Sequence, residues 1–226
     1  MEKELRYIEE EIRTSQDSRD VDGYALLFNT TSRNLGGFVE RIDPSAMDGV
    51  LEASDIMAVL NHDPSRGILA RSRFGVGSLT LSVDEKGLRY TFSAPHTALG
   101  DECLEYLRRG DITQSSFAFT VKEDTWDKQD DGTYIRTIKK FDRLYDVSPV
   151  FEPAYFGTEV KCARFQEVLD EEKAENERKL AELEKEEQAK REAEEQEKAE
   201  KLKEYYDELR KEYQDALEKA KDMNNN

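Results

Sequence analysis

The chain has few of the residue types that bind metals or form cross-links. Among its 226 residues there are two histidines, two cysteines and one tryptophan. Cys103 and Cys162 stand alone, without the paired spacing of a zinc site, so we expect no metal and no other cofactor. Two isolated thiols are typical of a reducing compartment, although a disulfide between them stays open as an alternative.

An excess of basic residues and long apolar runs are also lacking. The 34 Lys and Arg residues are outnumbered by 51 Asp and Glu residues, which gives a net charge of −17. A protein without a basic face is not expected to bind nucleic acid. No stretch approaches the ~20 apolar residues that cross a membrane, and the acidic N-terminal stretch does not resemble a signal peptide. We therefore expect no membrane partner.

Glycine and proline are absent from the last part of the chain. Both occur up to Gly157, whereas the sequence from Gln166 onward consists mostly of Glu, Lys, Ala, Gln and Leu. Strong helix formers without breakers predict a long helix or a helical pair. The sequence therefore predicts a globular domain over residues 1–165 and a charged helical tail over residues 166–226.

The globular part is predicted to be mostly β with a few helices. A helix is expected between Thr97 and Gly110, and a weak edge strand within residues 5–13. Pro149 is expected to end the last strand, because proline cannot donate to a ladder. Many short strands favour a mainly antiparallel sheet closed into a β-barrel with flanking helices. The other predicted strands cover residues 21–28, 38–42, 56–60, 68–74, 77–83, 87–92, 117–121, 134–138 and 144–150.

One serine has a distinctive position directly after a helix and a loop. In the strand that follows Gly110, alternate residues face opposite ways, so Phe117 and Phe119 share one face. Ser116 begins the other face, which carries small side chains. We expect the aromatic face to be buried and the Ser116 hydroxyl to be held rigidly yet reached by a substrate. The simpler interpretation is that a serine in a strand is only a small polar spacer.

Two further motifs accompany this serine. An apolar run leads into Asn61-His62-Asp63, and a later strand carries Asp146 to Val150, followed by Pro153-Ala154. With Ser116 to Phe119 between them, these motifs have the order found in the prohead maturation serine proteases of tailed phages. Residues 7–160 resemble that family. The resemblance implies a barrel similar to the herpesvirus assemblin protease.

The chemistry of the three motifs fits the activity that the resemblance implies, a serine endopeptidase. A serine hydroxyl is a weak nucleophile until a neighbouring base takes its proton, and His62 is the candidate base. A third group usually holds the imidazole in one tautomer, and the resemblance gives this role to Asp146. The predicted catalytic residues are His62, Ser116 and Asp146. No Gly-x-Ser-x-Gly elbow is present, which argues against an ordinary α/β-hydrolase.

Other residues compete for these roles on sequence grounds alone. Ser115 is the rival nucleophile, whereas His96 precedes a predicted helix where the family has no catalytic residue. Backbone N–H groups near Ser116 and the Arg71 side chain are candidates to bind an oxyanion. The carboxylates that compete with Asp146 are Asp63, Asp111 and Asp142.

The tail has the features of an assembly segment. From Ala199 to Ala220 the apolar residues alternate in steps of three and four, a heptad pattern of about three repeats. This pattern predicts self-association through the C-terminal helix. Between residues 184 and 198 the pattern is replaced by Glu, Lys and Arg at helical spacing, which is typical of a single solvated helix. An acidic, extended helix suggests a scaffold-like role.

The combined prediction is a capsid-maturation serine endopeptidase with a helical assembly tail. By resemblance it acts in the host cytoplasm, inside the assembling prohead, on major capsid and scaffold proteins and on itself. Self-cleavage is expected between residues 158 and 179, in an exposed junction. One alternative is a protease-like scaffold protein without activity. Another, an unrelated acidic coiled-coil adaptor, leaves the three motifs unexplained.

Overall fold

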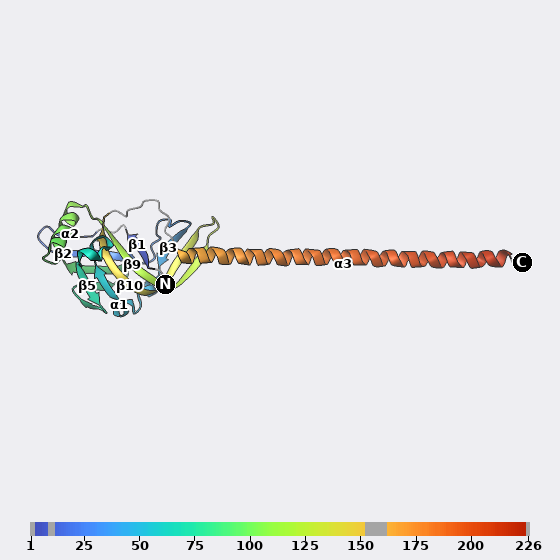
Figure 1. Cartoon of the computed structure of the whole chain (residues 1–226), viewed down its shortest axis with the longest axis horizontal. Helices are drawn as coiled ribbons and strands as arrows, with labels where there is room; N and C mark the ends of the chain where they lie inside the picture. Colours follow the sequence, from blue (N-terminus) through green and yellow to red (C-terminus); the bar gives the residue numbers. More distant parts are fainter. Residues whose placement is uncertain (1–2, 9–11, 152–161, 225–226) are drawn as a thin grey trace. The chain divides into compact units, whose positions relative to one another are not determined.

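The computed structural model describes residues 3–8, 12–151 and 162–224. By its internal contacts the chain divides into two compact units, Met1–Ala163 and Arg164–Asn226. Figure 1 shows the strands of the first unit and the long helix of the second. In the described ranges, no helix has the length and apolar character needed to cross a membrane.

The larger sheet contains the strand that carries Ser116. It has seven strands in the order β1-β9-β10-β4-β5-β6, with β3 paired to β10 beside this path. The pairings of β10 with β3 and with β4 are parallel, and the others are antiparallel. Its strands are β1 (Glu4–Ile8), β3 (Phe38–Ile42), β4 (Asp55–Ala58), β5 (Ala70–Arg73), β6 (Val76–Gly77), β9 (Gln114–Lys128) and β10 (Tyr134–Val150).

The smaller sheet has three strands in the order β2-β8-β7. The Asp84 N–H donates to the Gly87 carbonyl at 3.0 Å in the turn that joins β7 and β8 as an antiparallel hairpin. Apolar side chains of both sheets belong to one core, to which Leu88 contributes from β8 and Phe117 from β9. Its strands are β2 (Asp20–Leu27), β7 (Thr80–Val83) and β8 (Gly87–Ser93).

The expected closed barrel is wrong: no sheet of the described strands closes on itself. β1 and β6 end the path of the larger sheet, and β2 and β7 end that of the smaller one. The cause lies in β10, whose register against β9 shifts repeatedly between Ile138 and Asp146. One edge of the bent β10 pairs with β3 near its start and with β4 near its end. The sheet therefore branches, and the fold is mixed β structure with helices.

The face alternation predicted around Phe117 is present in β9. The rings of Phe117 and Phe119 lie 4.9 Å apart, and both are buried, which confirms the aromatic core face. The opposite face is buried as well, because Ser116 and Ala118 are fully covered. β10 ends at Val150, the predicted end of this strand, but it runs through Pro149, so the proline itself does not stop it. The β4 edge of β10 pairs only at Asp146 in the described residues, so no ladder bond on that edge needs an N–H from the proline.

Capping residues define the principal helix of the first unit, α2 (Ala98–Arg109). The Thr97 hydroxyl accepts a hydrogen bond from the Gly100 N–H at 3.2 Å, and the left-handed Gly110 ends the helix, as predicted. Cys103 faces the core from α2, and no disulfide joins it to Cys162, so that open alternative is not realised. The shorter helical segments are α1 (Val50–Ala53), η1 (Pro44–Met47), η2 (Leu60–His62) and η3 (Pro64–Arg66).

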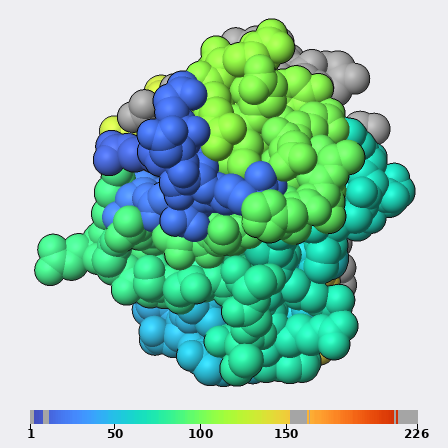
Figure 2. All heavy atoms as spheres, turned by 90° about the vertical axis from the view of Figure 1, so that its left-hand side faces the viewer, coloured from blue at the N-terminus to red at the C-terminus, as the bar shows by residue number. Residues whose placement is uncertain are grey.

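The segment that leads into β2 packs against α2. Arg19 forms an ion pair with Asp101 at 2.8 Å, and the Arg108 guanidinium donates to the Ser18 carbonyl at 2.9 Å. Figure 2 shows this face of the first unit, where the blue N-terminal residues lie beside the green residues of α2. Both ends of α2 are therefore fastened to the start of the smaller sheet.

All described residues of the second unit belong to one helix, α3 (Ala163–Asn224). Oppositely charged residues four positions apart form ion pairs along it, as expected for a solvated helix. Leu202, Tyr206 and Leu209 of the predicted heptad pattern are exposed. The later side chains of that pattern, from Tyr213 onward, lie outside the described side chains. The ion pairs are Glu175–Lys179, Glu187–Arg191 and Glu197–Lys201.

Candidate active site

Three neighbouring strands bring the predicted catalytic residues together. Ser116 lies near the start of β9, opposite Ser148 of β10, and Asp146 stands two residues before Ser148 on the same strand. On the other edge of β10, Asp146 pairs with Met57 of β4. The chain leaves β4 and enters the short segment η2, which ends at His62. Residues 54 positions apart in sequence, such as His62 and Ser116, therefore meet at one end of adjacent strands.

The three side chains form a continuous hydrogen-bonded row. His62 Nδ1 lies 2.5 Å from Asp146 Oδ1, and His62 Nε2 lies 2.5 Å from Ser116 Oγ. An ionised Asp146 accepts the Nδ1 proton, which leaves the Nε2 lone pair facing the serine hydroxyl when the imidazole is neutral. This is the geometry in which an imidazole can take a proton from a hydroxyl.

An unusual backbone conformation turns His62 towards β9 and β10. Asn61 and His62 both have left-handed backbone angles, with φ of 55° and 58°. Such angles are uncommon for residues other than glycine, and asparagine tolerates them better than most. Asp63 then begins the next turn, where its carboxylate accepts from the Ser65 N–H at 3.0 Å. Hydrogen bonds from the Ser65 hydroxyl and N–H lower the pKa of Asp63. This carboxylate therefore caps the turn after His62 and is not the partner of the imidazole.

Asp146 is buried and remains ionised. Burial alone raises the pKa of its carboxyl group, but the hydrogen bonds with His62 and Ser148 and the charge of Lys3 outweigh burial and lower it. The Ser148 hydroxyl donates to Asp146 Oδ1 at 2.8 Å, and Lys3 Nζ lies 3.5 Å from Oδ2. A carboxylate held in this way can fix the imidazole tautomer and balance the charge of an imidazolium.

The two adjacent serines have different partners. Ser115 Oγ lies 2.9 Å from the Tyr90 hydroxyl of β8, in the core between the sheets. Burial raises the pKa of Tyr90, so this phenol is no base at neutral pH. Ser116 Oγ instead faces His62 and also donates to the Arg6 carbonyl at 2.9 Å. Of the two serines, Ser116 is the one in contact with a histidine.

The remaining sequence candidates lie away from this row. Asp142 accepts from the Thr120 hydroxyl at 3.2 Å, and Asp111 pairs with Arg109 at 3.1 Å. His96 is exposed in the loop before α2. The Arg71 guanidinium, a candidate for oxyanion binding, forms a two-bond ion pair with Asp55 at 2.7 and 2.6 Å. Pro153-Ala154 and residues 158–161 of the expected self-cleavage range lie outside the described residues, and the part of that range from Ala163 onward lies in α3.

Sequence reasoning missed several residues that contact the row. Ser148 had a weak signal, because it stands two positions after Asp146 and so shares its face of the strand. Arg6 had none, because it contributes a backbone carbonyl. Tyr7 lies in β1, as Arg6 does, and Lys3 directly precedes that strand. The Tyr7 and His62 rings meet edge-on, with 6.3 Å between their centroids.

The match to a protein-family model agrees with the resemblance in the sequence. Residues 5–171 match the family model of the caudovirus prohead serine proteases. Among solved structures, the bacteriophage T4 capsid assembly protease gp21 is similar, with a TM-score of 0.42 and 12% identity, over 67% of this chain and 99% of that chain. No curated protein matches the chain in sequence. Because the family match spans most of the sequence, the chain belongs to the caudovirus prohead serine protease family.

Proposed function

We propose that this protein is an active serine endopeptidase of phage capsid maturation, with Ser116 as nucleophile, His62 as base and Asp146 as the group that orients the base. The observation that carries the proposal is the row from Asp146 through His62 to Ser116, with both contacts at 2.5 Å. Membership of the prohead protease family supports the reaction class.

The first half of the reaction forms an acyl-enzyme. His62 Nε2 takes the proton of Ser116 as Oγ bonds to the carbonyl carbon of the scissile peptide. Asp146 stays ionised and stabilises the imidazolium through the Nδ1 contact. The imidazolium then gives its proton to the leaving amine nitrogen as the C–N bond breaks.

The second half returns the enzyme to its starting state. A water molecule attacks the ester carbon while His62 Nε2 takes one of its protons. The ester bond to Ser116 Oγ then breaks, and the serine oxygen recovers that proton. The products are a carboxylic acid, formed in this step and ionised by loss of its proton to water, and the amine already released.

The proposed substrates follow from the family rather than from the site. Prohead proteases act inside the assembling shell, so the major capsid and scaffold proteins are the proposed substrates. The protein is also proposed to cut its own chain between residues 158 and 179. In the tail, the exposed Leu202, Tyr206 and Leu209 support self-association that places the enzyme within the shell.

A proteome-derived peptide library tests the activity because it offers many cleavage sequences at once. The wild-type protein is expected to create new peptide termini, read by mass spectrometry, and the Ser116→Ala variant none. New termini from neither protein would contradict the proposal and favour the alternative of a protease-like scaffold protein without activity. New termini from both would place the activity elsewhere.

A further inference from the structure

The proposed nucleophile is covered in this structure. Ser116 has an exposed fraction of 0%. In the described part of the chain, two groups form hydrogen bonds with its Oγ, His62 Nε2 and the Arg6 carbonyl. A peptide carbonyl carbon must come within about 3–3.5 Å of a nucleophile before it reacts. No substrate reaches the hydroxyl in this arrangement, so some element must move before cleavage.

The element in contact with the whole row is β1, together with Lys3 directly before it. It is an edge strand whose ladder partner is β9, and Tyr7 stands directly opposite Ser116 in that ladder. An edge strand can separate without breaking the ladder between β9 and β10. The contacts with the three residues are Arg6 carbonyl to Ser116 Oγ at 2.9 Å, Lys3 Nζ to Asp146 Oδ2 at 3.5 Å and the Tyr7 ring to the His62 ring at 6.3 Å.

The Arg6 contact holds the hydroxyl in a resting arrangement. Ser116 has one hydroxyl proton, and the Arg6 carbonyl competes for it with His62 Nε2. A proton donated to the carbonyl is not available to the base. The Arg6 oxygen faces Oγ as a hydrogen-bond acceptor, so β1 occupies the site without presenting a carbonyl carbon for attack.

We propose that β1 is a displaceable cover and that the β9 edge beneath it binds the substrate as an extended peptide strand. With β1 displaced, residues 115–119 of β9 offer backbone N–H and C=O groups to a new strand, a common mode of peptide recognition. The inference rests on the proposed function, because the extended strand is the substrate of that hydrolysis.

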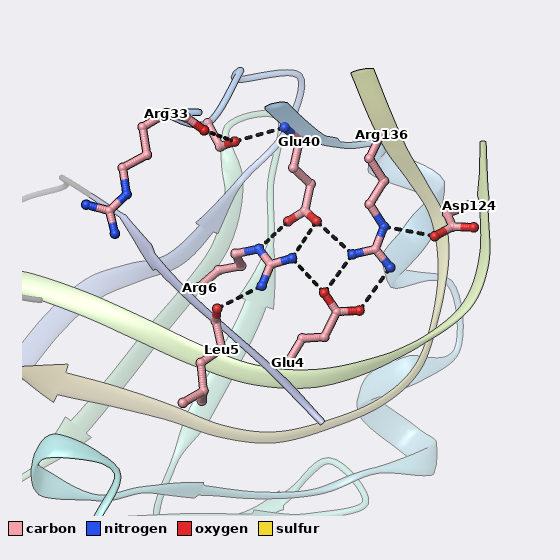
Figure 3. Close-up of polar contacts among 8 residues, drawn as sticks. Glu4, Leu5, Arg6, Arg33, Glu40, Asp124 and Arg136 are labelled. Carbon is pink, nitrogen blue, oxygen red and sulfur yellow. Dashed lines mark hydrogen bonds and ion pairs between the residues drawn. The ribbon is translucent and has the colours of Figure 1, made fainter. Parts of the chain in front are cut away.

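A cluster of buried charges fastens the cover. Figure 3 shows this latch cluster, which joins Glu4 and Arg6 of β1 to Glu40 of β3, Asp124 of β9 and Arg136 of β10. Two ion pairs join β1 to the rest of the sheet, across the boundary between them. Arg6 donates two hydrogen bonds to Glu40, at 2.9 and 2.8 Å, and Arg136 donates two to Glu4, at 2.6 and 2.9 Å.

When the latch cluster opens, each of its charged groups keeps an oppositely charged neighbour on its own side. On β1, Arg6 and Glu4 contact each other at 2.6 Å. On the other side, Arg136 contacts Glu40 at 2.9 Å and Asp124 at 2.8 Å. Breaking a buried ion pair is strongly destabilising when it leaves an unpaired charge. Here β1 keeps one carboxylate with one guanidinium, and the other half keeps two carboxylates with one guanidinium, so displacing β1 leaves no charged group without a partner.

A reversible cross-link between β1 and β9 tests the displacement in the folded protein. Leu5 and Ala118 are ladder partners, so the double variant Leu5→Cys with Ala118→Cys places two thiols across the boundary. The readout is the rate at which a fluorophosphonate probe labels Ser116. We expect oxidation to slow labelling at least tenfold and reduction to restore it. The two single-cysteine variants, oxidised in the same way, are the controls.

The outcomes of the cross-link experiment distinguish a failure of the proposed β1 displacement from a failure of the proposed protease function. Equal labelling of the oxidised and reduced forms would overturn the cover while leaving the proposed function intact. Absence of labelling in both forms, and in the wild type, would overturn the proposed function and with it the inference. Peptide mapping of the oxidised protein establishes that the cross-link joins positions 5 and 118.

A matched pair of substitutions in the latch cluster tests the same inference without a cross-link. Glu40→Gln weakens the grip on Arg6, whereas Asp124→Asn removes a carboxylate that contacts Arg136 on the other side of the boundary. At a temperature where both variants are folded, we expect Glu40→Gln to label at least tenfold faster than Asp124→Asn, because the open population rises. Equal or slower labelling of Glu40→Gln would show that β1 is a fixed part of the site.

Discussion

Ser115 and Ser116 are neighbours in β9, yet their hydroxyls belong to different networks. Ser115 Oγ lies 2.9 Å from the Tyr90 hydroxyl in the core, whereas Ser116 Oγ lies 2.5 Å from His62 Nε2. Both serines are fully buried, so burial does not distinguish them. The identity of the hydrogen-bonding partner does, and it gives the two residues opposite expected phenotypes.

Ser115→Ala is expected to lower stability and keep activity. The substitution leaves the buried Tyr90 hydroxyl without its partner, which costs about 1–3 kcal/mol of unfolding free energy. Urea denaturation measures this loss. Adding Tyr90→Phe removes the orphaned hydroxyl and should recover part of it. A Ser115→Ala variant that is folded but unable to cleave would contradict the assignment of Ser116.

Asp146→Asn is expected to reduce kcat on the order of 10⁴-fold, because the imidazole loses its tautomer and its counter-charge. His62→Ala should cost more, on the order of 10⁶-fold, since it removes the base itself. Single-turnover cleavage of a peptide substrate measures both. An asparagine variant as impaired as the alanine variant would show that Asp146 does more than orient and stabilise His62.

The same carboxylate predicts a pH dependence of stability. The pKa of Asp146 is lower in the folded protein than the ordinary value of about 3.9 in the unfolded chain. Its ionic contribution is therefore fully present above pH ~4 and is lost as the pH falls through the lower folded-state pKa. The stability advantage of the wild type over Asp146→Asn should therefore shrink as the pH falls below ~4. An advantage that persists or grows over that acidic range would contradict this account.

Asn61 sets the direction of His62 through its left-handed backbone. Asn61→Gly is expected to fold and cleave normally, because glycine adopts a φ near 55° without strain. Asn61→Val should lose about 1–2 kcal/mol of stability and also activity, as the turn relaxes and the imidazole moves. Thermal unfolding and kcat are measured together. Normal activity in the valine variant would remove Asn61 from the positioning of the base.

Charged substitutions in the heptad pattern test the tail. Leu202→Lys with Leu209→Lys should weaken self-association at least tenfold in sedimentation experiments, because the apolar seam is interrupted. Leu180→Lys is the matched control, since Leu180 is also exposed on α3 but lies outside the pattern.

A chain truncated after residue 165 should still cut peptides but fail to enter assembling shells. Shell entry by the truncated chain would show that the tail is not the targeting element.

Self-cleavage is tested by intact-mass spectrometry of the incubated protein. The wild type is expected to yield a fragment ending between residues 158 and 179, while Ser116→Ala stays whole, because exposed junctions are readily drawn into a protease site. A wild-type chain that stays full-length while it cuts peptides would contradict self-cleavage at this junction.

Local features of the fold were predictable because their causes lie within a few residues. The cap at Thr97 and the stop at Gly110 define α2, and the alternation around Phe117 defines the core face of β9. The residues that form the hydrogen-bonded row were also singled out from their motifs. What brings them together, the pairing of β10 with both β9 and β4, depends on contacts distant in sequence.

The closed barrel failed for a related physical reason. Closure depends on which strand edges meet. Register shifts in β10 divide one of its edges between β3 and β4, and these shifts have no recognisable pattern in the sequence. The role of Arg6 was invisible for another reason, since any residue type supplies a carbonyl. The guanidinium of Arg6 is buried beside Glu40. In the sequence it is only one charged residue in a weakly patterned strand, with no sign of its partner.

The most direct test of the account is the site of covalent modification by a fluorophosphonate probe. Such probes react with a serine only when a base activates it. Intact mass and peptide mapping should find one label, on Ser116, in the wild type and in Ser115→Ala. Ser116→Ala and His62→Ala should remain unlabelled. Labelling of Ser115, or equal labelling of wild type and His62→Ala, would contradict the claim that Ser116 is a nucleophile activated by His62.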